Sequence, residues 1–133
     1  MDATLLWTLA TLVLAGSLWI PYIVGANLHP APGDPFRRPH DGAHLPDWVA
    51  RANRAHLNLL EQSMPFAGAV LVAHVAGATG ALTAWAAGAF FALRVLHALG
   101  MIAGWARFPV RPLIFTGGWL CILAVAGAAV LAT

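Results

Sequence analysis

Four polar residues between positions 51 and 61 have the types and the spacing to bind a small polar molecule. In a helix that turns by about 100° per residue, they fall within a sector of roughly 80° and form one stripe: Arg51, Arg54, Asn58 and Glu61. Arginine offers forked donors to a carboxylate, asparagine offers amide hydrogen bonds, and glutamate accepts from an ammonium group. The set suits a zwitterionic, peptide-like ligand. A purely structural alternative stays open, in which Arg54 and Glu61 neutralise each other.

A second cluster of cations follows further along the chain. Arg94 and His97 are three residues apart and therefore lie on one face of a helix. Arg94 lies deep in an apolar stretch, where an ionisable side chain costs about 2.5–3.5 kcal/mol, so it must pair or face water. A salt bridge to Glu61 and a contact with a ligand are both open. Arg111, next to Pro112 at the expected start of a helix, has the position to hold an anion or a thiolate, and it could equally extend to lipid phosphates.

The composition places these charges in a membrane protein. Of the 133 residues, 60% are hydrophobic and only 9% are charged, whereas a soluble domain has about 25% charged and about 45–50% apolar residues. The net charge of +2 is small, and the sequence has no basic stripe of the kind that binds nucleic acid. We expect a single domain over residues 1–133, with the lipid bilayer and hydrophobic small molecules as partners.

The hydrophobicity pattern predicts an all-α fold, an integral membrane four-helix bundle. A helix needs roughly 20 apolar residues to cross the hydrocarbon core, and the expected spans cover about residues 5–24, 50–78, 82–103 and 113–131. Five prolines between residues 30 and 46 forbid one continuous helix there, so a polar loop outside the bilayer is expected. Abundant glycine and alanine in the last three spans let helices approach closely, which favours a tight bundle or an oligomer.

The arginines also predict the orientation of the protein. The second connection and both termini carry none, whereas most arginines lie in or just after the first loop or in the third: Arg37, Arg38, Arg51, Arg54, Arg107 and Arg111. By the positive-inside rule, the first and third loops are then cytoplasmic and both termini lie on the opposite side. We expect a multi-pass protein of a bacterial inner membrane.

Two other features are interpreted as having no role in chemistry. Cys121, the single cysteine, lies in an apolar run and is expected to act as a small hydrophobic residue. His40, Asp41 and His44 have metal-binding side chains, but they fall in the proline-rich loop. We therefore expect no metal site.

The stripe belongs to a longer motif. The sequence Arg-Ala-His-Leu-Asn-Leu-Leu-Glu at residues 54–61, followed by Met-Pro-Phe at residues 64–66, resembles the second-helix signature of the MAPEG family. These are the membrane-associated proteins in eicosanoid and glutathione metabolism. The motif is most similar to the microsomal glutathione transferase branch, where it reads Arg-Ala-His-x-Asn-x-x-Glu. Arg-Val-Leu-His at residues 94–97 matches a third-helix pattern. The length and the four expected spans agree, so the resemblance covers essentially the whole chain.

The resemblance implies a homotrimer that binds glutathione, as a co-substrate, between neighbouring subunits near the cytoplasmic side. The glutathione-binding residues are then expected to be Arg51, Arg54, Asn58, Glu61, Arg94 and His97. Arg111, or alternatively Arg107, would stabilise the thiolate, because a nearby cation raises the thiolate fraction of a thiol. The implied reaction is conjugation of glutathione to a hydrophobic electrophile, or reduction of a lipid hydroperoxide.

The sequence also departs from the family pattern. Met101 replaces the tyrosine often found four residues after the third-helix histidine, and Gln62 follows Glu61 where some branches have tyrosine. The only tyrosine is Tyr22, in the first expected span. A non-catalytic membrane protein on the same scaffold, serving as a subunit or as a binder of small molecules or lipids, is therefore the alternative. A transporter is disfavoured, because the second loop is uncharged and one polar stripe offers no path across.

Overall fold

The computed structural model describes residues 1–33 and 41–133. The described part is helical and contains no strand, which confirms the all-α prediction. Its five helical segments are α1 (Ala3–Ser17), α2 (Trp19–Leu28), α3 (Asp47–Val75), α4 (Ala81–Ala103) and α5 (Val110–Leu131). The predictions that concern Arg37, Arg38 and His40 lie outside the described residues.

The first expected span is longer than the sequence pattern indicated and is divided in two. α1 and α2 follow each other with only Leu18 between them, and together they cover Ala3–Leu28. Pro21 lies in the first turn of α2 and has no N–H to donate to the carbonyl of Ser17, four residues earlier. The missing hydrogen bond accounts for the interruption at this point.

Three of the helical stretches are long and apolar enough to cross a membrane: Ala3–Leu28, Ala81–Ala103 and Val110–Leu131. α3 has 29 residues, more than the roughly 20 that crossing requires, but its first half carries the polar stripe. Four crossings therefore remain a prediction. α5 begins at Val110 instead of residue 113, because Pro112 falls in the first turn, where a helix tolerates a missing N–H.

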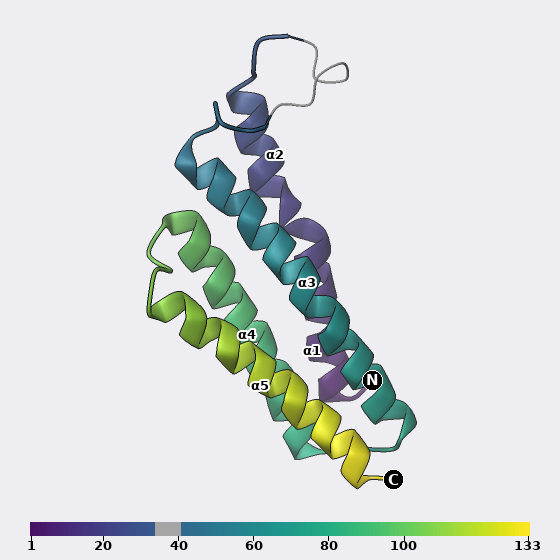
Figure 1. Cartoon of the computed structure of the whole chain (residues 1–133). Helices are drawn as coiled ribbons and strands as arrows, with labels where there is room; N and C mark the ends of the chain where they lie inside the picture. Colours follow the sequence, from purple (N-terminus) through teal and green to yellow (C-terminus); the bar gives the residue numbers. More distant parts are fainter. Residues whose placement is uncertain (34–40) are drawn as a thin grey trace.

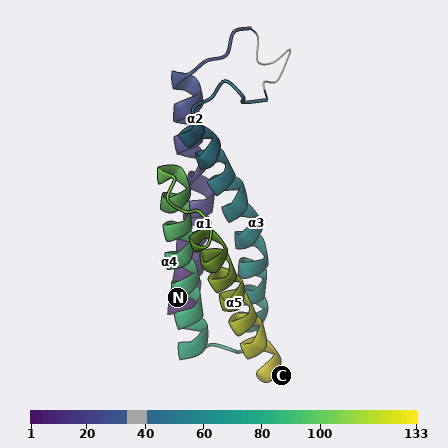
Figure 2. The same cartoon turned by 60° about the vertical axis from the view of Figure 1, so that its left-hand side comes forward.

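The helices run side by side in an elongated bundle (Figures 1 and 2). The end of α2, the start of α3 and the loop from α4 to α5 lie towards one end, while both termini and the turn from α3 to α4 lie towards the other. In the core, the rings of Phe66 and Phe90 stack with centroids 4.0 Å apart, and Val125 of α5 packs in the same cluster. Which end faces the cytoplasm stays a prediction.

The first turn of α3 packs closely against α2 at Gly25. A Cβ atom added to Gly25 of α2 would lie 2.5 Å from Cγ2 of Val49 and 2.7 Å from the ring of Trp48. Val49 has no exposed surface. The absence of a side chain at Gly25 therefore lets the first turn of α3 pack directly against α2.

We predict that Gly25→Ala lowers the free energy of unfolding by about 1–3 kcal/mol, the usual cost of overpacking a core. Gly16→Ala is the matched control, because nothing lies within 4 Å of a Cβ added there. Unfolding of both variants in detergent, followed by circular dichroism, measures the difference. Equal stability of the two variants would show that the contact at Gly25 is unimportant.

Candidate functional site

The polar stripe of α3 straddles the boundary between the buried and the exposed faces of the helix. Arg51 and Asn58 lie at one edge of the stripe, are half-buried and contact neighbouring helices, whereas Arg54 and Glu61 lie at the other edge and are exposed. The four residues therefore divide into two pairs. The alternative in which Arg54 and Glu61 neutralise each other is not seen, since no ion pair joins them in the part of the chain that the structure describes.

Arg51 is held by the carboxyl end of α4. Its Nε donates to the carbonyl of Met101 at 2.9 Å, and its Nη2 donates to the carbonyl of Ile102 at 3.2 Å. A cation at this end of a helix satisfies carbonyls that lack helical partners and opposes the negative end of the helix dipole. The guanidinium of Arg51 therefore joins α3 to α4, and its role in binding a ligand stays a prediction.

Arg94 of α4 is the largest of the fully buried side chains, with an exposed fraction of 1%. Its Nη2 donates to the carbonyl of Ile114 at 3.1 Å, and its Nη1 donates to Oδ1 of Asn58 at 3.5 Å. The guanidinium also lies over the rings of Phe90 and Phe115, at 5.4 and 5.9 Å from their centroids. A salt bridge from Arg94 to Glu61, one of the two roles left open by the sequence, is absent among the described residues.

Room for the guanidinium comes from a glycine on α5. A Cβ added to Gly118 would lie 2.5 Å from Nη2 of Arg94. His97, three residues further on α4, is 2% exposed. Nε2 of His97 and Nε of Arg94 have no hydrogen-bond partner within the described chain. Both side chains are buried in the single chain, and their predicted contact with glutathione stays a prediction.

A cavity of about 310 Å³ brings together two of the residues that the sequence predicted. Asn58 of α3 and Arg111 of α5 both line it, with three further residues of α5: Pro112, Phe115 and Thr116. Arg107, the alternative to Arg111, is outside this cavity, and its Nε donates to the carbonyl of Gly104 at 3.1 Å. An arginine and an amide side chain thus share one concave surface close to the exposed Arg54 and Glu61 on α3.

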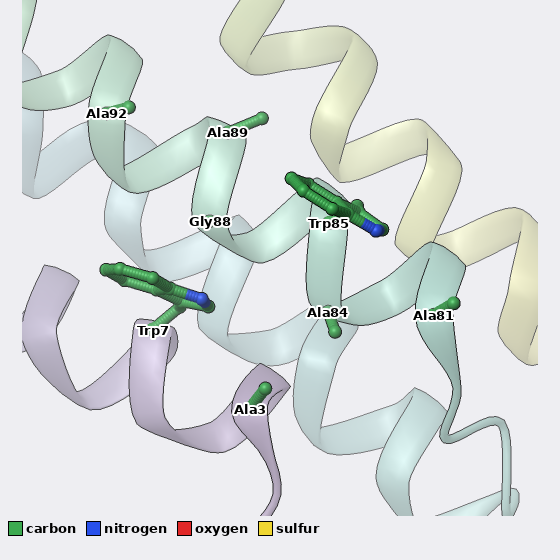
Figure 3. A pocket seen from close by; sticks show the side chains of 8 residues that line it. All are labelled: Ala3, Trp7, Ala81, Ala84, Trp85, Gly88, Ala89 and Ala92. Carbon is green, nitrogen blue, oxygen red and sulfur yellow. The ribbon is translucent and has the colours of Figure 1, made fainter.

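A larger cavity, of about 530 Å³, lies between α1 and α4 and has a different chemistry. Figure 3 shows the rings of Trp7, on α1, and Trp85, on α4, with only alanines and Gly88 around them among the labelled residues. Its lining is almost wholly apolar, and neither charged nor amide side chains belong to it. It therefore lacks the groups that would fix a polar ligand, and the smaller cavity is the candidate site.

Several residues around the candidate site were not found from the sequence. Phe115 and Thr116 follow no spacing rule that would mark them, and the carbonyl of Ile114 belongs to the backbone. The pair Gly117-Gly118 in an apolar helix was a signal of close packing, but the sequence does not say which side chain fills the space. In the described residues, no group of three or more His, Cys, Asp or Glu is placed to hold a metal ion.

Comparison with known proteins agrees with the motif on α3. A family model described as MAPEG family matches residues 3–131. No curated protein and no solved structure was found to match the chain. The matched region includes all five helices and every residue of the candidate site. The chain therefore belongs to the MAPEG family.

Proposed function

We propose that the protein is a glutathione-dependent membrane transferase or peroxidase that acts on hydrophobic electrophiles or lipid hydroperoxides. Its nearest relatives in function would be the microsomal glutathione transferases. The observation that carries the proposal is the cavity in which Asn58 and Arg111 meet, with Arg54 and Glu61 exposed on the adjoining face of α3. Membership of the family supports a role connected with glutathione or eicosanoid metabolism.

In the proposed reaction, Arg54, Asn58 and Glu61 bind the charged and amide groups of glutathione. Arg111 stabilises the thiolate, because a guanidinium next to a sulfur favours the deprotonated form. The sulfur then attacks an electrophilic carbon, forming a C–S bond while the leaving group departs with its electron pair and the thiol proton passes to solvent. With a hydroperoxide, two glutathione molecules are oxidised to the disulfide, and the peroxide is reduced to an alcohol and water.

The exposed face of α3 supports assembly into the proposed homotrimer. Arg54 and Glu61 share this face with the large apolar side chains of Leu57, Leu60 and Met64, which are 41% to 79% exposed. Contact with lipid is favourable for the apolar side chains but costly for the charged ones, and contact with water has the opposite effect. A neighbouring copy of the chain satisfies both kinds, and it would complete the glutathione site near the cytoplasmic side of a bacterial inner membrane.

A non-catalytic role on the same scaffold is the second candidate. Met101 occupies the position at which a tyrosine often helps the thiol in related proteins, and it is only 6% exposed. Tyr22, the only tyrosine in the chain, lies on α2 and lines another cavity. In this reading the protein binds glutathione, a lipid or a partner subunit without chemistry, and Arg111 contacts an anionic group that does not react.

We predict that wild-type protein binds glutathione, and that Arg54→Ala and Glu61→Ala each weaken binding by about tenfold or more. A hydrogen bond to a charged group contributes about 1.5–3 kcal/mol, and about 1.4 kcal/mol is a factor of ten. Isothermal titration calorimetry in nanodiscs measures the affinity. Asn53→Ala is the matched control, since it removes a polar side chain from the same helix outside the stripe. No binding by wild type at millimolar glutathione would reject the proposed function.

A second prediction concerns the two candidate arginines at the start of α5. Arg111→Ala should lower kcat for conjugation of an aryl halide by about tenfold or more, the effect of one pKa unit on the thiolate fraction, and should change glutathione affinity less. Arg107→Ala should have the smaller effect, because that guanidinium bonds to the backbone of Gly104. The reverse order would make Arg107 the activating residue. No turnover by wild type that binds glutathione would favour the non-catalytic role.

A further inference from the structure

The hydrogen bond between Arg94 and Asn58 has a fixed direction. A guanidinium carries five N–H donors and no acceptor, so only the carbonyl oxygen of the Asn58 amide can face it. Nη1 of Arg94 lies 3.5 Å from this oxygen, Oδ1. The NH2 group of the same amide then points away from Arg94. Because Asn58 also lines the cavity next to Arg111, this NH2 group is the part of the amide that remains for a ligand.

Arg94 itself has little freedom to turn. The carbonyl of Ile114 accepts from its Nη2, the rings of Phe90 and Phe115 lie beside it, and the guanidinium packs directly against Gly118 of α5. These contacts within the chain hold the guanidinium in its orientation. Arg94 is not among the residues that line the cavity, but it contacts two of them, Asn58 and Phe115.

The polar groups that line the cavity are then mostly donors. The guanidinium of Arg111 and the NH2 group of Asn58 can only donate, and the hydroxyl of Thr116 can do either. Among the described residues, no carboxylate belongs to the lining. A cavity of this kind binds an anionic acceptor and disfavours an ammonium group, because it offers a cation no partner.

We propose that Arg94 is a positioning residue, which turns the Asn58 amide so that Asn58 and Arg111 form a two-donor subsite for an anionic group of the ligand. The anionic group is a thiolate or a carboxylate. The identity of the ligand in this inference rests on the proposed function, whereas the preference of the subsite for an anion does not. It also gives a role to a cation that is costly to place inside a membrane protein.

The first test uses no glutathione. The chain has three asparagines, Asn27, Asn53 and Asn58, so protein labelled with 15N-asparagine gives three pairs of side-chain NH2 signals, and Asn58→Asp identifies the pair of Asn58. Inorganic sulfate, as the probe anion, should shift this pair in wild type. In Arg94→Gln the same concentration should shift it by less than half as much, because glutamine can face Asn58 with either a donor or an acceptor. An equal shift in both proteins overturns the inference, and so does no shift in wild type.

The second test is a double-mutant cycle on ligand affinity, with glutathione sulfonate as a permanently anionic probe. Arg94→Gln and Asn58→Ala should each weaken binding by about tenfold, and the double variant should bind no more weakly than Asn58→Ala alone. Additive losses would mean that Arg94 acts independently of Asn58 and would overturn the inference. Thermal unfolding of each variant checks the fold, and Arg94→Lys, which keeps the donors and the charge, should restore part of the affinity.

The two tests separate the inference from the proposed function. A positive sulfate result without glutathione binding keeps the subsite and rejects the glutathione-dependent reaction. Glutathione binding with additive losses keeps the proposed function and rejects the role of Arg94. Two further ligands identify the anionic group in the subsite: S-methylglutathione lacks a thiolate, and glutathione diethyl ester lacks free carboxylates. The ligand that lacks the group bound in the subsite should bind wild type and Arg94→Gln with equal affinity.

Discussion

The buried guanidinium of Arg94 is the interaction on which the arrangement of α3, α4 and α5 around the site depends. A cation inside a membrane-spanning bundle is tolerated only where polar or aromatic groups surround it. Here the groups come from three helices: Asn58 from α3, Phe90 from α4 and the carbonyl of Ile114 from α5. The same contacts bring Asn58 and the first turns of α5 together, and the cavity that they form includes Arg111.

The charged side chains of the stripe on α3 differ from Arg94 of α4 in the partners that they have. Arg51 is satisfied within the chain by the carbonyls at the end of α4, whereas Arg54 and Glu61 are exposed and have no partner in the described residues. Charges in a membrane protein that are neither buried nor paired require a neighbour, a ligand or water. In the single chain, Arg51 and Asn58 have hydrogen-bond partners, whereas Arg54 and Glu61 have none among the described residues. The proposed ligand and the proposed assembly would both supply partners for Arg54 and Glu61.

The sequence was sufficient to predict the helical fold, the apolar spans and the family, because these depend on long hydrophobic runs and on a motif of eight residues. It also singled out Asn58 and Arg111, which line one cavity. The sequence could not predict that Arg51 and Asn58 would be half-buried while Arg54 and Glu61 are exposed. Which side of α3 is buried depends on where α2 and α4 pack against it. The interruption at Leu18 and the backbone partner of Arg94 likewise depend on contacts between residues far apart in the sequence.

The most direct test of the account is an experimental structure of the protein in lipid with glutathione bound. The account predicts density for the peptide against the exposed face of α3, with an anionic group in hydrogen-bond distance of Arg111 and of Nδ2 of Asn58, and Arg94 still bonded to Oδ1. An acyl chain in that cavity in place of the peptide, or an Asn58 amide that no longer contacts Arg94, would contradict it.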